Sequence, residues 1–293
     1  MKIIINMRVN RRQALQVTLL GISSTLALSG LARSESVQIA ADTNDPYAAE
    51  VDAGLAYFKD LATRQLPLVE NLLREIRNGN VDRAKQAYLE ARPPYEQIEV
   101  LAPSFEQTDS DIDARPYSFD GGEFDPEFKG FHKIEAFLFR DGETQAALPY
   151  TEELVESVKT LSADLDRREN FNSRLHFEGL IALATEIASK KISGEEETWS
   201  DRSLLIFREN WSGIYSQFEP FSQTLARRDA GAADAVRAAY ETAQATIDPY
   251  FNRDRLAGEP YSSIDTQTRA AIVRSSYQLR DRLLQAMERL DLA

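Results

Sequence analysis

The residues best placed to do chemistry are His132 and Glu135, three positions apart in the segment Asp125–Gly142. On a helix, residues three positions apart lie on the same face. That face also carries apolar residues, namely Phe128, Phe131, Leu138 and Phe139. An ionised carboxylate in such surroundings is costly unless it is paired or binds a cation. An imidazole and a carboxylate one turn apart can bind one ion, so this H-x-x-E turn predicts a metal site.

The same turn has an interpretation without a metal. A histidine on an apolar helix face is usually a core residue whose hydrogen bonds are satisfied. Glu135 could likewise be neutralised by an arginine. Arg115 and Arg140 flank the segment and could pair with its carboxylates or simply be surface charges.

Three further carboxylates strengthen the metal hypothesis. Glu96 and Glu99 are also three positions apart, and Asp113 lies in an acidic stretch between the two candidate helices. With His132 and Glu135 they form a hard set of oxygen and nitrogen ligands. Such a set suits iron, manganese, zinc or calcium rather than copper(I). The alternative is that these acids belong to a solvated helix face and a surface loop.

Composition narrows the function classes. The 293 residues include 47 acidic and 34 basic ones, a net charge of −13. This balance argues against nucleic-acid binding, which needs clustered positive charge. The absence of cysteine excludes disulfides, thiolate catalysis and iron–sulfur clusters. The only histidines are His132 and His176, so any metal must be bound mostly by carboxylates. The sequence contains no H-E-x-x-H, G-x-S-x-G, phosphate-loop or dinucleotide motif.

The first 40 residues are predicted to be an export signal that is removed. Arg11 and Arg12 precede an uncharged, largely apolar run from Val17 to Ala32, which is short for a membrane span. The paired arginines resemble a twin-arginine signal, and the alternative is a general-secretory signal. No other segment is long and apolar enough to cross a membrane. The mature chain is therefore expected to be soluble and periplasmic.

The remaining chain shows helical rather than strand periodicity, which predicts an all-α protein. A first helix is expected from Pro46 to Gly79, and a second starts at Asn80 and is broken or kinked at Pro93-Pro94. A long polar loop is expected from Pro103 to Asp125, followed by a helix that ends near Asp141-Gly142. Five later helices are expected at about 150–167, 172–191, 201–228, 231–248 and 265–291.

The sequence resembles the imelysin-like family, and in particular the EfeO/EfeM-type periplasmic proteins of ferrous-iron uptake. The Gly130–Glu135 segment carries the family's G-x-H-x-x-E pattern. Other matching segments occur in the family's order: Tyr95–Glu99, Asp111–Arg115, Lys191–Glu196, and then Phe207, Asn210 and Gly213. The chain resembles the shorter EfeM form, which lacks the cupredoxin domain of EfeO proteins.

The resemblance implies a fold of two up-and-down four-helix bundles, at about 45–170 and 171–293, within a domain spanning 41–293. Pro67 and Pro220, one in each half, raise the hypothesis of a duplicated bundle. The resemblance also implies a metal site between helices. Its ligands by position are His132, Glu135, Glu96, Glu99, Asp113 and, as the weakest match, Glu186.

The function implied by the resemblance is iron binding in an EfeUOB-type uptake system. The expected cargo is Fe²⁺ or Fe³⁺. The expected partners are a membrane iron permease and a periplasmic peroxidase of the same system. No enzyme activity is expected. Two alternatives stay open: a metallopeptidase, since the family is grouped with peptidases, and a binder of acidic polysaccharide that uses the metal as a bridge.

Overall fold

Helices make up all the regular structure in the residues that the computed structural model describes, 45–194 and 196–293, and no strand occurs among them. The predicted all-α class is thus confirmed. The predicted export signal, residues 1–40, lies outside the described residues. Among the described helices, none combines the length and apolar character needed to cross a membrane.

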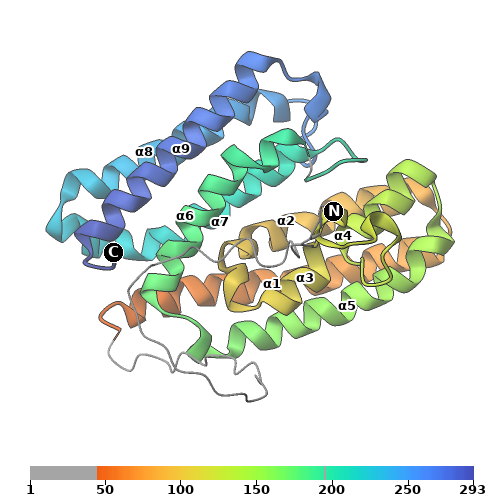
Figure 1. Cartoon of the computed structure of the whole chain (residues 1–293), viewed down its shortest axis with the longest axis horizontal. Helices are drawn as coiled ribbons and strands as arrows, with labels where there is room; N and C mark the ends of the chain where they lie inside the picture. The colour runs from red at the N-terminus through yellow and green to blue at the C-terminus, as the bar shows by residue number, and fades with distance from the viewer. Residues whose placement is uncertain (1–44, 195) are drawn as a thin grey trace, which may run out of the picture. The chain divides into compact units, whose positions relative to one another are not determined.

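Three long helices form an N-terminal group: α1 (Ala48–Arg77), α2 (Val81–Ile98) and α5 (Thr144–Asp166), with α1 in contact with both of the others (Figure 1). Helix α1 buries an apolar stripe that includes Leu55, Phe58, Leu61, Val69 and Leu72. Burial of each such side chain contributes about 1.5–3 kcal/mol. Asn80 begins α2 as expected, because its side-chain oxygen accepts a hydrogen bond from the Arg83 backbone N–H at 3.1 Å.

Four helices form a C-terminal group: α6 (Ser173–Ser189), α7 (Ser203–Arg228), α8 (Ala230–Ile247) and α9 (Thr266–Arg289). They pack in a ring in which α6 contacts α7 and α9, and α8 contacts the same two helices. Side-chain caps begin three of them, with Asn172, Asp229 and Asp265 accepting hydrogen bonds from the first turns of α6, α8 and α9. The later helices predicted from periodicity are all present.

Two glycines allow close packing between the N-terminal and C-terminal helix groups. A Cβ on Gly213 in α7 would lie 2.3 Å from the Gln97 carbonyl oxygen of α2. A Cβ on Gly179 in α6 would lie 2.2 Å from the carbonyl oxygen of Val100, in η2 (Glu99–Ser104). Only glycine allows such close approach. These contacts place the C-terminal end of α2 directly against α6 and α7, while the predicted bundle boundary near residue 170 stays a prediction.

Of the two outcomes predicted at Pro93-Pro94, a break or a kink, the break does not occur. Helix α2 continues through both prolines to Ile98. A proline in a helix interior costs about 3 kcal/mol because a backbone hydrogen bond is lost. The side chains on either side of the prolines, Arg92 and Glu96, are fully buried and paired with each other. These tertiary contacts favour the helical path over a break.

The predicted loop from Pro103 to Asp125 is also only partly correct. It contains η2 and a further helix, α3 (Glu106–Asp113), followed by the short turns η3 (Pro116–Ser118) and η4 (Gly122–Phe124). One face of α3 is buried through Thr108, Ile112 and Asp113. Helical periodicity is hard to recognise in eight residues of which only Ile112 is apolar, so the burial of this face decided the helix.

The helix of the H-x-x-E motif begins later than predicted. It starts at Phe131 rather than Asp125, as α4 (Phe131–Glu135), and continues as the π-helical turn η5 (Ala136–Asp141). Gly130 has φ +80°, and a Cβ there would lie 2.3 Å from the Ile112 carbonyl oxygen. Close contact with the end of α3 therefore fixes the start of α4. The predicted end at Asp141-Gly142 is confirmed by the left-handed Gly142.

We expect Gly213→Ala to lower the free energy of unfolding by about 1–3 kcal/mol, because the methyl group forces α7 away from the Gln97 backbone. This loss occurs although alanine favours a helix by about 1 kcal/mol over glycine. The control is Gly231→Ala in α8, whose Cβ would lie 3.4 Å from its nearest neighbour, an Asp229 oxygen. Urea denaturation measures both. Equal midpoints for the two variants would contradict the proposed contact.

Candidate metal centre

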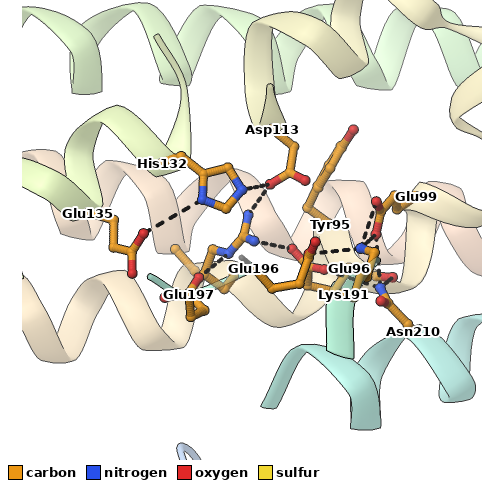
Figure 2. A network of polar contacts seen from close by, with 12 residues as sticks. Tyr95, Glu96, Glu99, Asp113, His132, Glu135, Lys191, Glu196, Glu197 and Asn210 are labelled. Atoms are coloured by element: carbon orange, nitrogen blue, oxygen red, sulfur yellow. Dashed lines mark hydrogen bonds and ion pairs between the residues drawn. The ribbon is translucent and has the colours of Figure 1, made fainter. Parts of the chain in front are cut away.

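Arg92 is buried in a network of polar side chains, of which Figure 2 labels the carboxylates and His132. Its Nη2 is 2.6 Å from Glu96 Oε1, its Nη1 is 2.5 Å from Asp113 Oδ1, and its Nε is 2.9 Å from Glu197 Oε1. The Arg92 side chain is 0% exposed. It also lies over the ring of Phe131, 4.8 Å from the centroid. One cation thus connects α2, the end of α3 and the segment after α6.

His132 and Glu135 lie beside this centre, as the H-x-x-E spacing predicts. Nε2 of His132 is 3.3 Å from Asp113 Oδ1, and its Nδ1 is 3.6 Å from Glu135 Oε2. The other Glu135 oxygen, Oε1, accepts hydrogen bonds from the backbone N–H groups of Trp199 and Ser200, at 2.9 and 2.8 Å. The segment between α6 and α7 therefore holds Glu135 through its backbone.

Lys191 forms the opposite end of the network. Its ammonium donates to both Glu99 oxygens, at 2.9 and 2.7 Å, and to Glu196 Oε2 at 2.8 Å. Asn210 of α7 completes this end, because its Nδ2 donates to Glu96 Oε2 at 3.1 Å and to Glu99 Oε2 at 2.9 Å. Figure 2 shows Lys191 and Asn210 on the Glu99 side, away from His132.

Five of the six predicted ligands meet in this network: Glu96, Glu99, Asp113, His132 and Glu135. The sixth, Glu186, lies on α6 and pairs with Lys190 of the same helix at 3.5 Å. Arg115 does pair with the carboxylates, contacting Asp113 at 3.0 Å and also Glu196. Arg140 does not lie among them, because it pairs with Glu123 and Asp141 at the surface.

Four members of the network were not predicted as site residues: Arg92, Lys191, Glu196 and Glu197. Arg92 precedes Glu96 by four positions, which is the spacing of an ion pair on a helix. Because the sequence predicts a break or a kink at Pro93-Pro94, Arg92 and Glu96 were not expected to lie on one continuous helix. In the sequence, Lys191 and Glu196 belong to a segment that resembles the family. The spacing of Glu197 does not indicate that its side chain is buried. The roles of Lys191, Glu196 and Glu197 depend on contacts that their segment makes with α2 and η2 and with Glu135 of α4.

The network contains more negative than positive groups. Six carboxylates face three permanent cations, Arg92, Arg115 and Lys191, together with His132. All six carboxylates are buried. Because buried ionised groups need compensation, the excess negative charge must attract protons or a further cation.

The titration properties of the network reflect this imbalance. Burial by itself would lower the pKa of His132, but the Asp113 and Glu135 carboxylates beside its ring raise it to about 9. Burial raises the pKa of Glu197 to about 8, and the neighbouring Glu135 carboxylate adds to this effect. Burial opposes ionisation of Asp113, yet Arg92 and Arg115 hold its pKa well below the usual value.

The ligand set is chemically suited to a hard metal ion, but its side chains are engaged with one another. In the part of the chain that the structure describes, no three His, Asp or Glu side chains are arranged as ligands around one point. Arg92 separates Asp113 from Glu96 and Glu197. Some oxygens still receive no hydrogen bond, including Glu135 Oε2 and Glu196 Oε1.

The family model described as imelysin (Peptidase_M75) matches residues 54–290. The chain belongs to the imelysin family. Two relatives carry the name Efem/EfeO family lipoprotein. One, from Staphylococcus haemolyticus, is 27% identical over 204 residues, covering 69% of this chain and 70% of the relative. The other, from Staphylococcus aureus strain MRSA252, is 28% identical over 204 residues, covering 69% and 71%. The resemblance to this family predicted from the sequence is confirmed.

The second histidine of this imelysin-family chain lies apart from the network. His176 of α6 is buried, with Nδ1 3.2 Å from the Asn172 carbonyl oxygen and its ring near Phe171 and Phe221. Burial lowers the pKa of His176 to about 4. It is therefore a neutral core histidine, whereas His132 is held among carboxylates.

The low pKa of His176 predicts that the folded protein loses stability in acid. Between about pH 6.5 and pH 4 the unfolded His176 binds a proton that the folded one excludes, so its contribution to stability is lost as pH falls through that window. His176→Leu removes this contribution. The unfolding free energy of the variant minus that of wild type should therefore rise by about 2–3 kcal/mol when the pH is lowered from 7 to 4. Denaturant titrations at both pH values measure it, and a constant difference would contradict the assignment.

Proposed function

We propose that this imelysin-family protein is an exported metal-binding protein that captures iron and passes it to a membrane permease. The observation that carries the proposal is the excess of buried carboxylates over permanent cations around the H-x-x-E turn. A bound cation would compensate this charge in a site that excludes water. The Efem/EfeO names of the relatives support iron as the cargo.

The His132 end of the network is the proposed place for the ion. Glu135 Oε2 faces His132 and receives no hydrogen bond from the described residues. Asp113 Oδ1 lies 3.3 Å from His132 Nε2, and Glu197 is linked to Glu135 through Ser200, so these two are the proposed further acids. Glu96 and Glu99 instead bind Arg92, Lys191 and Asn210. Their contribution to binding is proposed to be through negative charge.

The mixed ligand set also suits release. Carboxylate and imidazole ligands favour iron, manganese, zinc or calcium, and each must be deprotonated to bind. Acidification therefore weakens the proposed binding. Iron is the proposed physiological cargo, Fe²⁺ or Fe³⁺, with zinc, manganese and calcium as competitors. The proposed compartment is the periplasm, with a permease and a peroxidase of the same uptake system as partners.

The double variant His132→Ala, Glu135→Ala should bind Fe²⁺, under anaerobic conditions, at least tenfold more weakly than wild type, because it loses both ligands of the motif turn. Isothermal titration calorimetry with Fe²⁺, Zn²⁺ and Ca²⁺ measures the effect. The matched control is Glu186→Gln, which removes a predicted acid that lies outside the network. Wild-type affinity in the double variant would remove the proposed site.

A peptidase role is less well supported, although the family model carries a peptidase designation. Hydrolysis requires a metal with an open position and a base that activates water next to the substrate. The network side chains are buried by the surrounding helices, so a polypeptide substrate has no direct access to them. Binding of acidic polysaccharide is opposed by the net charge of −13.

The proposal of a non-enzymatic role predicts that the metal-loaded protein leaves unfolded casein intact. Gel electrophoresis after long incubation with Zn²⁺ or Fe²⁺ measures cleavage, and a chelator-treated sample provides the baseline. Cleavage that disappears in the His132→Ala, Glu135→Ala variant would instead establish a metallopeptidase.

A further inference from the structure

Arg92 binds the acids that the proposed ion would need. Its Nη1 holds Asp113 Oδ1 at 2.5 Å, and the same oxygen lies 3.3 Å from His132 Nε2. Asp113 Oδ1 is therefore shared between a guanidinium and the motif histidine. The other Asp113 oxygen faces Arg115 at 3.0 Å. An ion bound to His132 that recruits Asp113 has to draw it from Arg92.

Glu197 is shared in the same way. Its Oε1 accepts hydrogen bonds from Arg92 Nε at 2.9 Å and from the Tyr88 hydroxyl at 3.0 Å, while Oε2 accepts one from Ser200. The backbone N–H of Ser200 in turn binds Glu135. Arg92 thus binds Asp113, which contacts His132, and Glu197, which is linked to Glu135 through Ser200.

We propose that Arg92 is a built-in competitor that limits how tightly the network binds a metal ion. The guanidinium neutralises Asp113 and Glu197 when no ion is present, and an incoming ion has to exchange with it for these carboxylates. This inference rests on the proposed function, since it concerns affinity at the same site. Competition by Arg92 explains how a network with many carboxylates releases a bound metal ion.

Arg92 competes with the metal ion because of its position in the network and not only because of its charge. Lys191 is an equally buried cation of the same network, but it binds Glu99 and Glu196 at the opposite end. Removing Lys191 changes the total charge as much as removing Arg92 does. Removal of Arg92, and not of Lys191, frees Asp113 and Glu197 from their ion pairs with the guanidinium. Lys191 therefore provides a matched control.

The test is Zn²⁺ titration calorimetry on the metal-free full-length protein and on the variants Arg92→Met, Arg92→Lys and Lys191→Met. We expect Arg92→Met to bind Zn²⁺ at least tenfold more tightly than wild type, or about 1.4 kcal/mol. Lys191→Met should change affinity less than threefold. Without metal, Arg92→Met should melt at a lower temperature than wild type, and Zn²⁺ should raise its melting temperature by more.

Unchanged or weaker binding by Arg92→Met would overturn the inference, and so would equal tightening by Lys191→Met. If Arg92→Met does not fold, Arg92→Lys decides the matter. A lysine cannot reproduce the fork of guanidinium contacts, so severalfold tighter binding is expected, and unchanged affinity in that variant overturns the competition.

The same data separate the inference from the proposed function. Binding by Arg92→Met without binding by wild type would refute the metal-binding function yet support competition by Arg92. Binding by wild type that Arg92→Met does not improve would refute the competition alone. Absence of binding in every variant would refute both.

Discussion

The structure depends on one constraint, the burial of a guanidinium among carboxylates. Arg92 has no exposed surface, and it contacts Glu96, Asp113 and Glu197. Withdrawal of such a charge from water is costly, and loss of one partner typically costs about 3–5 kcal/mol because the other charge is left unpaired. The three acids come from α2, from the end of α3 and from the segment that follows α6. One ionic interaction therefore specifies how segments distant in sequence must meet.

The surrounding backbone is shaped to permit this meeting. Glycines in α6 and α7 let these helices approach the end of α2, and Gly130 lets α4 start against the end of α3. The π-helical turn η5 continues the same element directly after Glu135, and such turns are frequent at functional sites. Backbone N–H groups of Trp199 and Ser200 then fix Glu135. The position of the H-x-x-E turn is therefore fixed by the close contact at Gly130 and by the hydrogen bonds from Trp199 and Ser200 to Glu135.

Charge imbalance connects this architecture to the proposed function. The network has six buried carboxylates but three permanent cations, so the remaining acids must be neutralised by protons or by a further cation. A mobile metal ion can supply the missing positive charge. Lys191 occupies one end of the network, and at the other end Arg92 shares Asp113 with the motif histidine.

The sequence alone determined the helical class, most helix positions and the pairing of His132 with Glu135, because helical periodicity and i, i+3 spacing are local properties. It also indicated Glu96, Glu99 and Asp113 as companions. Only the tertiary structure decided that α2 continues through Pro93-Pro94, that α3 is a helix, and that Arg92, Lys191, Glu196 and Glu197 join the site. These outcomes depend on contacts between distant segments. The energy of those contacts outweighs local propensity, and spacing along the chain does not encode it.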